Sequence, residues 1–199
     1  IVEQSPISVN APAGTFDGIN YINDSTVVLQ LFAPNKNFVY LISDLSNREL
    51  DPVYRMKKAL DGQHYWIQLN GIIPNQEYRF QYLVDNSINI GDPYSEKFLD
   101  RWNDPQIHPF IYPNLISYPV NKTSQLVSVF QTAQSSYQWT DQNFQRPDTR
   151  DLVIYELLVR DWHLWHNYQT ILDSIDYFKR LGINAIELMP VMEYDGNDS

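Results

Sequence analysis

Two glutamates are the first candidates for chemistry, because each lies in the middle of a strongly apolar run. Glu156 lies within residues 152–159, and Glu187 lies within residues 183–191. A pair of carboxylates can share the roles of nucleophile and general acid/base. In parallel α/β structures, however, sites are built at the carboxyl ends of the strands, and positions in the middle of a strand lie below those ends. We therefore expect Glu156 and Glu187 to be partnered, structural carboxylates, and we assign no catalytic residue to this chain.

Charged and aromatic residues follow both apolar runs, at the strand ends where parallel α/β structures place their ligands. The first run is followed by Arg160, Asp161 and Trp162, and the second run is followed by Glu193, Tyr194 and Asp195. These six residues are the candidate substrate-binding residues. The alternative is that Arg160 and Asp161 pair with neighbouring residues and that Trp162 packs against its own loop.

Two short patterns raise the question of a metal site. His163 and His166 are three positions apart, and residues 195–198 faintly resemble a calcium-binding loop. Two imidazoles fall short of the roughly four ligands of a closed zinc site, and the chain has no Cys. The rest of an EF-hand pattern is absent from the sequence. We therefore expect no metal and no cofactor.

Composition and charge exclude several classes of partner. The chain has 14 Lys and Arg against 24 Asp and Glu, a formal charge of −10, and no basic cluster beyond two adjacent pairs, so we expect no nucleic-acid partner. Apolar runs are far shorter than the roughly 18 residues that a membrane span needs, so we expect a soluble chain with no membrane partner. The compartment stays unknown, because neither the lack of Cys nor residues 1–5 decide it. Secretion or a periplasmic location, after removal of a signal segment, is one open alternative.

The pattern of residues before position 151 predicts β-strands. Residues 26–33, 38–42, 65–69 and 78–84 are rich in β-branched and aromatic residues and are separated by turn residues. Their spacing predicts an all-β sandwich over residues 1–130, with 26–33 and 38–42 as a hairpin candidate. The proline-rich residues 100–125 predict an extended connector along the surface of this domain, and residues 131–150 predict a linker.

The pattern changes at residue 151. Residues 152–159 and 183–191 have the near-continuous apolar character of strands in a parallel sheet. Between them, apolar residues at steps of three and four predict a helix over about 168–181, with Gly182 placed to end it. Residues 151–199 therefore predict a β-α-β unit, too short for a complete α/β domain.

Several segments resemble the α-amylase family, glycoside hydrolase family 13. The β-α-β region carries DLVIYELLVRD (151–161), LDSIDYFKRLG (172–182) and INAIELMPVME (183–193) in the family's order. Before it, the segments at 27–34, 61–66, 78–82 and 91–94 resemble the immunoglobulin-like domain, similar to carbohydrate-binding module family 48, that precedes the barrel in branching and debranching enzymes.

The resemblance implies a multidomain protein: an immunoglobulin-like sandwich followed by the first β-α-β unit of a (β/α)8 TIM barrel that is incomplete in this chain. It implies an enzyme that hydrolyses or transfers α-1,4 or α-1,6 glucosidic bonds of glucans such as starch or glycogen. Such an enzyme acts through a covalent glycosyl-enzyme intermediate. The resemblance places the catalytic carboxylates on barrel strands 4, 5 and 7, so this chain alone is expected to be inactive. Exposed apolar strand surface also predicts one of two outcomes for residues 151–199: self-association, or docking on the sandwich and linker in an arrangement other than a barrel. The alternative is a non-catalytic glycan-binding or structural protein with the same domains.

Two departures from the family pattern stand out. Many relatives have His at the position of Leu158. Residues 43–50 also lack the aromatic that some members stack on sugar. We therefore expect glycan binding by residues 1–130 to be weak or absent. The sequence does not separate amylase, branching, debranching and trehalose-forming specificities.

Overall fold

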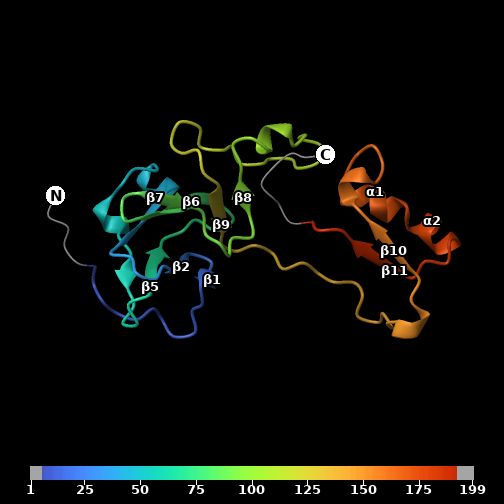
Figure 1. The fold of residues 1–199 in the computed structure, drawn as a ribbon, viewed down its shortest axis with the longest axis horizontal. Helices are drawn as coiled ribbons and strands as arrows, with labels where there is room; N and C mark the ends of the chain where they lie inside the picture. Colours follow the sequence, from blue (N-terminus) through green and yellow to red (C-terminus); the bar gives the residue numbers. More distant parts are fainter. Residues whose placement is uncertain (1–5, 192–199) are drawn as a thin grey trace. The chain divides into compact units, whose positions relative to one another are not determined.

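The computed structural model describes residues 6–191, which divide into two compact units. Unit 1 contains the chain up to Gln106 and residues 115–136, whereas unit 2 contains residues 107–114 and the chain from Tyr137 onward. Figure 1 labels β1, β2 and β5 to β9 in unit 1, and β10, β11, α1 and α2 in unit 2. No helix within residues 6–191 is long and apolar enough to cross a membrane.

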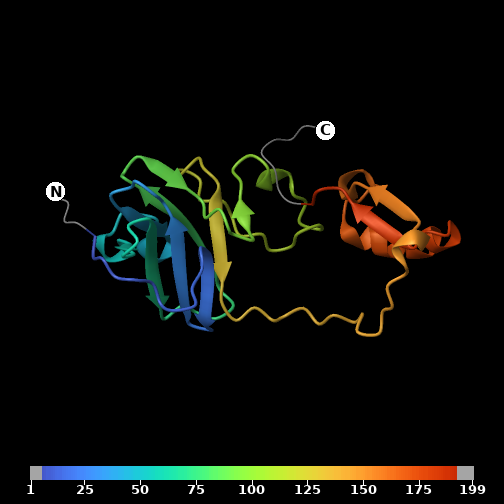
Figure 2. The ribbon, with the colours of Figure 1, turned by 60° about the horizontal axis from the view of Figure 1, so that its bottom comes forward.

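Unit 1 is built from two antiparallel sheets, whose strands can be followed in Figure 2. The first sheet has the strand order β1-β2-β5-β4, with β1 Gly18–Asn23, β2 Thr26–Phe32, β4 Lys57–Lys58 and β5 His64–Asn70. The second has the order β3-β6-β9-β8, with β3 Val39–Ser43, β6 Glu77–Val84, β8 Phe98–Leu99 and β9 Val127–Gln131, and β7 (Ile88–Ile90) pairs with β6. Short 3-10 turns lie at η1 Asp44–Ser46, η2 Pro52–Tyr54 and η3 Asp104–Gln106.

Alternation along the strands produces the core between the two sheets. In β6, Tyr78, Phe80 and Tyr82 are buried in the central cluster, whereas Arg79 and Gln81 belong to the opposite face. The cluster draws its other members from both sheets, including Leu29, Leu41, Ile67 and Phe130. Because burial of one such side chain stabilises a fold by about 1.5–3 kcal/mol, this shared core accounts for the pairing of the sheets. The predicted all-β domain is confirmed.

The predicted hairpin of residues 26–33 with 38–42 is wrong. Strand β2 pairs with β1 and β5, and β3 pairs with β6 in the other sheet. The intervening residues therefore cross between sheets, which lie about 10 Å apart in a sandwich. The Asp85 carboxylate fixes this crossing by accepting from the backbone N–H groups of Asn37 at 2.9 Å and Phe38 at 3.1 Å. The turn residues predicted the change of direction but not which partner strand follows it.

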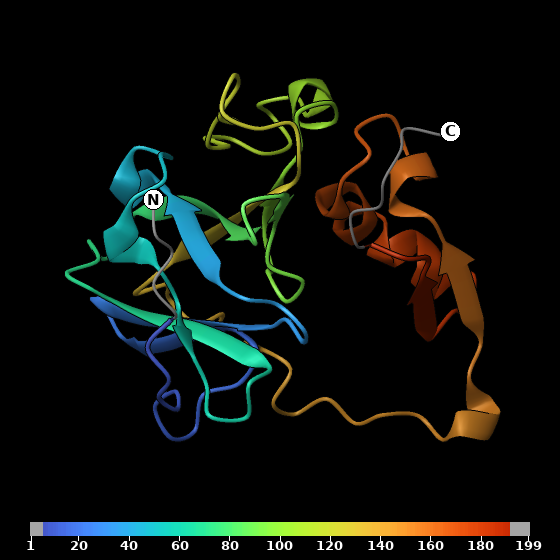
Figure 3. The same cartoon turned by 60° about the vertical axis from the view of Figure 1, so that its left-hand side comes forward.

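Unit 2 contains a parallel β-α-β arrangement (Figure 3). Strand β10 (Ile154–Leu157) pairs in parallel with β11 (Ala185–Leu188), and the helices lie between them in the chain, after the turns η4 Thr149–Asp151 and η5 Val159–Asp161. Leu157, Ile171 and Phe178 form the buried centre of this unit. The predicted order of strand, helical segment and parallel strand is therefore present.

The predicted single helix is divided in two. Helix α1 covers Tyr168–Asp173 and α2 covers Ile175–Arg180, and Ser174 between them lies outside the helical region, at φ −94° and ψ 1°. The Ser174 hydroxyl donates to the Thr170 carbonyl at 2.7 Å, a back-bond that bends helices. Gly182 ends α2 in the left-handed region at φ +79°, as its position predicted.

A buried carboxylate provides a test of the unit 1 core. Asp92 is fully buried, and it accepts from the Tyr82 hydroxyl at 2.8 Å and from the Tyr94 N–H at 2.8 Å. We predict that Tyr82→Phe lowers the free energy of unfolding by about 1–3 kcal/mol, because the carboxylate loses a buried donor. Urea unfolding measures this loss.

Tyr40→Phe is the matched control for this substitution. The Tyr40 hydroxyl has no hydrogen bond to a described residue, although its ring lies beside the Arg55 guanidinium. Its removal should leave the free energy of unfolding nearly unchanged. Equal losses in the two variants would show that the Tyr82–Asp92 bond does not stabilise the core.

Candidate functional site

Arg160 and Asp161 lie in turn η5, directly after the carboxyl end of β10. Arg160 Nε donates to Asp161 Oδ1 at 3.1 Å, and both side chains remain exposed. Such a pair at a strand end can reach a ligand, yet exposed ion pairs of this kind contribute little to stability. Substrate binding by these two residues stays a prediction.

Trp162 packs within unit 2. Its ring centroid lies 4.9 Å from that of Phe178 and 5.9 Å from that of Tyr155, and its Nε1–H donates to Ser174 Oγ at 3.2 Å. Tyr177 completes this aromatic group. The contacts join β10, the loop after it, Ser174 and helix α2. Trp162 therefore holds the loop that carries Arg160 and Asp161.

The histidines of the same loop shape its backbone. His163 and His166 adopt positive φ values of 64° and 49°, which are uncommon for residues other than glycine. The Nδ1 atom of His166 contacts the Arg160 carbonyl oxygen, and both imidazoles are exposed. No group of three or more metal-binding side chains occurs within residues 6–191.

The remaining predicted site residues have different outcomes. Glu193, Tyr194 and Asp195 lie outside the described residues, as does the calcium-like stretch 195–198. Glu156 and Glu187 are register partners in the parallel pair. We expected both carboxylates to be partnered, but both are exposed and neither has an ion pair to a described residue. They are exposed because the sheet face opposite the helices is open. They lie opposite each other on adjacent strands, on the same face of the sheet.

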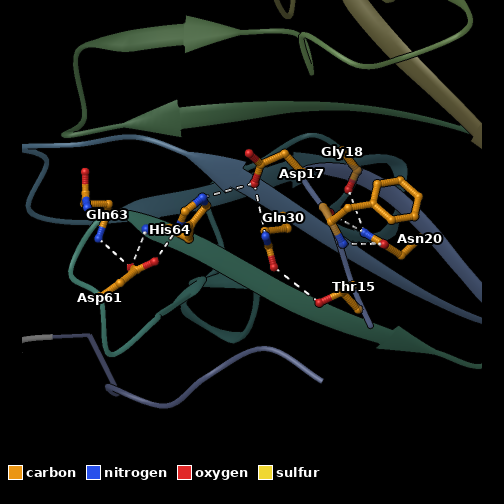
Figure 4. Close-up of polar contacts among 9 residues, drawn as sticks. Thr15, Asp17, Gly18, Asn20, Gln30, Asp61, Gln63 and His64 are labelled. Atoms are coloured by element: carbon orange, nitrogen blue, oxygen red, sulfur yellow. Dashed lines mark hydrogen bonds and ion pairs between the residues drawn. The ribbon is translucent and has the colours of Figure 1, made fainter. Parts of the chain in front are cut away.

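A polar cluster that the sequence did not predict lies on unit 1 (Figure 4). The His64 imidazole lies between two carboxylates, with Nδ1 2.5 Å from Asp61 Oδ2 and Nε2 3.4 Å from Asp17 Oδ1. Gln30 Nε2 donates to the same Asp17 oxygen at 3.1 Å, and Thr15 Oγ1 donates to Gln30 Oε1 at 3.3 Å. The side chains come from the segment before β1, from β2, from the turn between β4 and β5, and from the start of β5.

These contacts hold the turn before β5 against the segment before β1, and they do not form a catalytic arrangement. Each ring nitrogen of His64 already has a carboxylate partner, and the nearby Thr15 hydroxyl is bonded to Gln30 and to the Pro12 carbonyl. A hydroxyl activated for nucleophilic attack would instead be bonded to the base. Part of the cluster has a local signal, because Asp61 lies in a turn sequence, Asp-Gly-Gln-His, that favours carboxylate capping. Asp17 could not be predicted, since 47 residues separate it from His64.

The cluster predicts a specific response to acid. Asp61 accepts from the Gln63 N–H at 2.8 Å and from the His64 N–H at 3.1 Å. The Gln63 bond, followed by those from His64, lowers the pKa of Asp61 from 3.8 to about 2. A carboxylate with a lowered pKa stabilises the folded state above its unfolded pKa and loses this effect as pH falls through the folded value.

We predict that Asp61→Asn lowers the melting temperature at pH 5 and that this difference from wild type shrinks between pH 4 and pH 2. The effect should be small, because the Asp61 side chain is 44% exposed. Thermal unfolding across this pH range measures it. Asp24→Asn, in the exposed turn after β1, is the control and should follow the wild-type profile. A difference at Asp61 that stays constant down to pH 2 would contradict the prediction.

The chain is similar in sequence to several glucan-processing enzymes. No family model matches it. It is 25% identical over 175 residues to the malto-oligosyltrehalose trehalohydrolase of Saccharolobus solfataricus, covering 88% of this chain and 26% of the relative. It is 35% identical over 133 residues to chloroplastic isoamylase 3 of Oryza sativa, covering 61% and 15%. It is 24% identical over 196 residues to a 1,4-alpha-glucan branching enzyme of Clostridium perfringens, covering 90% and 26%.

Solved structures show the same fold. The pullulanase SAP of Group B Streptococcus superposes with a TM-score of 0.62 at 21% identity, covering 94% of this chain and 25% of that one. The apo pullulanase of Paenibacillus barengoltzii gives 0.61 at 18% identity, covering 92% and 28%. The chain thus spans about a quarter, or less, of the length of these proteins. The comparisons confirm the resemblance seen in the sequence: the homologues of this chain are members of glycoside hydrolase family 13, the α-amylase family.

Proposed function

We propose that the protein to which this chain belongs hydrolyses or transfers α-1,4 or α-1,6 glucosidic bonds of starch-like or glycogen-like glucans. The observation that carries this proposal is the similarity, over 88% of the chain, to a trehalohydrolase, together with the similarity to branching enzymes and isoamylases. Similar structures include a pullulanase with maltotetraose and another with maltotriose, which supports an oligosaccharide ligand.

In this proposal unit 1 is the immunoglobulin-like domain and unit 2 begins a (β/α)8 barrel. The parallel pair β10 and β11, with the helices between them in the chain, supports this assignment. Arg160 and Asp161, at the carboxyl end of β10, would then face the substrate together with Glu193, Tyr194 and Asp195. Trp162 would position their loop through its contacts with Tyr155 and Phe178.

In this proposal, cleavage of a glucosidic bond needs catalytic carboxyl groups that residues 1–199 do not supply. A retaining glycosidase uses two carboxyl groups about 5–5.5 Å apart, one as nucleophile and one as acid/base. Glu156 and Glu187 are adjacent, but both lie within their strands rather than beyond the carboxyl ends. We therefore expect barrel strands outside this chain to supply the catalytic pair.

Reducing-sugar release from soluble starch tests the proposal. We predict turnover by the protein expressed from its complete reading frame and no turnover above background by residues 1–199. Activity of residues 1–199 that survives repurification and is lost in Glu156→Gln would contradict the assignment and make Glu156 catalytic. Inactivity of the complete protein towards starch, glycogen and pullulan would favour the non-catalytic alternative.

Exposed apolar residues on unit 2 lead to a second expectation for the isolated chain. Val153, Ile154 and Leu188 are 50%, 54% and 41% exposed on or beside the two-stranded sheet. Such surface is unfavourable in water and tends to pair with another chain. We predict that residues 1–199 self-associate, and that Ile154→Lys weakens this association. Multi-angle light scattering measures the mass, and a wild-type monomer at high concentration would contradict the prediction.

A further inference from the structure

Strand β5 has an edge that its neighbour covers only in part. Strand β4 pairs with β5 at two positions, where Lys57 lies opposite Trp66 and Lys58 lies opposite Tyr65. Among the described residues, the part of β5 beyond Trp66 therefore has no strand beside it on this side. This part, residues 67–70, is the open edge of β5, and all of its residues line a groove of about 270 Å³.

Two residues of the open edge direct their backbone hydrogen-bonding groups away from the sheet. The Ala59 N–H donates to the His64 carbonyl at 2.8 Å, so the backbone groups of His64 face β4. Successive residues of a strand face opposite sides, so Gln68 and Asn70 face the same side as His64. Their N–H and C=O groups make no hydrogen bond there with a described residue. The open edge thus offers both donors and acceptors to a further strand.

Apolar side chains beside the open edge continue the core between the two sheets. Leu45 in η1 and Tyr54 in η2 pack against the central cluster and are only partly buried. Val53 in η2 is 77% exposed. All three line the groove together with residues 67–70. Alternate side chains of an added strand would lie over these residues, and covering them is favourable in water.

The charge of the groove indicates the kind of segment that fits it. Arg55 and Lys57 are the charged residues of its lining, and neither has an ion pair with a described residue. Asp51 does not line the groove, and its carboxylate accepts from the Val53 N–H at 2.9 Å. The groove is therefore positive in a chain whose formal charge is −10. Such a surface attracts a negatively charged partner.

Lys57 also lies on the face where the acidic side chains of a partner would be. It is the register partner of Trp66, and its Nζ lies 4.4 Å from the centre of the Trp66 ring. Its side chain is thus on the same face of the sheet as those of Gln68 and Asn70. An added strand with apolar residues towards Tyr54 would place its alternate residues on the face of Lys57.

A second copy of this chain fits the open edge less well. Pairing two open edges would join two identical segments, residues 67–70, which carry no carboxylate. It would also bring Arg55 and Lys57 of both copies to one interface, where like charges repel. An acidic segment of a different protein has neither disadvantage.

We propose that the open edge of β5 binds an extended acidic segment of another protein, which adds to the first sheet as a further strand. The backbone groups of Gln68 and Asn70 hold the segment through main-chain hydrogen bonds. Apolar residues at alternate positions of the segment cover Leu45 and Tyr54. Carboxylates at the positions between them lie on the face of Lys57 and give the edge its preference for an acidic partner.

Titration of the 199-residue chain with a blocked octapeptide of alternating glutamate and valine tests the proposal. The amide protons of Gln68 and Asn70 should shift and become protected from hydrogen exchange as the peptide saturates the edge. Those of Ile67 and Leu69 face β2 and should change little. The same peptide methylated on its glutamate nitrogens should cause neither effect, because those nitrogens face the edge. A lysine-valine octapeptide should bind at least about tenfold more weakly.

Variants separate the contributions of charge and apolar contact. Lys57→Glu should weaken the dissociation constant of the glutamate peptide about tenfold, because repulsion replaces attraction at the edge. Val53→Asp should also weaken binding, and it should keep the wild-type melting temperature because Val53 is 77% exposed. Lys179→Glu is the matched control, since it changes the net charge equally on an exposed face of α2 and should bind as wild type does.

The proposal is overturned if the glutamate peptide gives no saturable protection of Gln68 and Asn70, or if the lysine peptide binds equally well. Protection of these two amides that grows with the concentration of the chain alone would also overturn it, and would identify a second copy as the occupant. Self-association through unit 2 is distinguishable, because it leaves the amides of the open edge unprotected.

Discussion

Asp92 is fully buried in unit 1. Its hydrogen bonds connect β6 and β9 of one sheet with Tyr94, which packs against β1 of the other sheet. Its carboxylate accepts from Tyr82 in β6, and its backbone N–H donates to Ser128 Oγ in β9 at 2.7 Å. Tyr94, which donates to the same carboxylate, has its Cβ only 2.7 Å from where a Cβ on Gly18 would lie. Gly18 opens β1 in the other sheet at φ +99°, so only glycine fits there. Burial raises the pKa of Asp92, against the lowering effect of its hydrogen bonds.

On the outer face of β6, polar side chains hold residues 115–126 against the strand. Gln81 is fully buried there, accepting from Arg48 Nη2 at 2.5 Å and donating to the Leu126 carbonyl at 2.9 Å. Arg79 donates to the Ser117 carbonyl at 2.8 Å. The stretch 115–126 is thereby attached along this face. Because buried polar groups are costly unless they are paired, the network fixes where this stretch lies on unit 1.

The sequence predicted those features that depend on local pattern. Alternation at 78–84 identified a strand with an aromatic core face, and the apolar runs at 152–159 and 183–191 identified the two parallel strands. Long-range choices were beyond it: residues 34–37 read as a hairpin turn although they cross between sheets. Likewise, nothing in residues 107–114 showed that they would group with unit 2. The Asp17–His64 contact also depends on strand register, which turn chemistry and alternation leave open.

Two surfaces of unit 1 offer no open apolar platform for a ligand. Residues 43–50 carry no aromatic ring, and Arg48 from that stretch is itself buried, at 8% exposure, against Gln81. The neighbouring outer face of β6 is occupied by residues 115–126, so a pyranose ring cannot lie flat on it. The edge of β5 beyond Trp66 differs, because β4 pairs with β5 only at Tyr65 and Trp66, and Val53 and Tyr54 lie beside the uncovered part. Because β4 is only two residues long, this part of β5 has no neighbouring strand on that side among the described residues, and strand edges of this kind are where a further chain can pair.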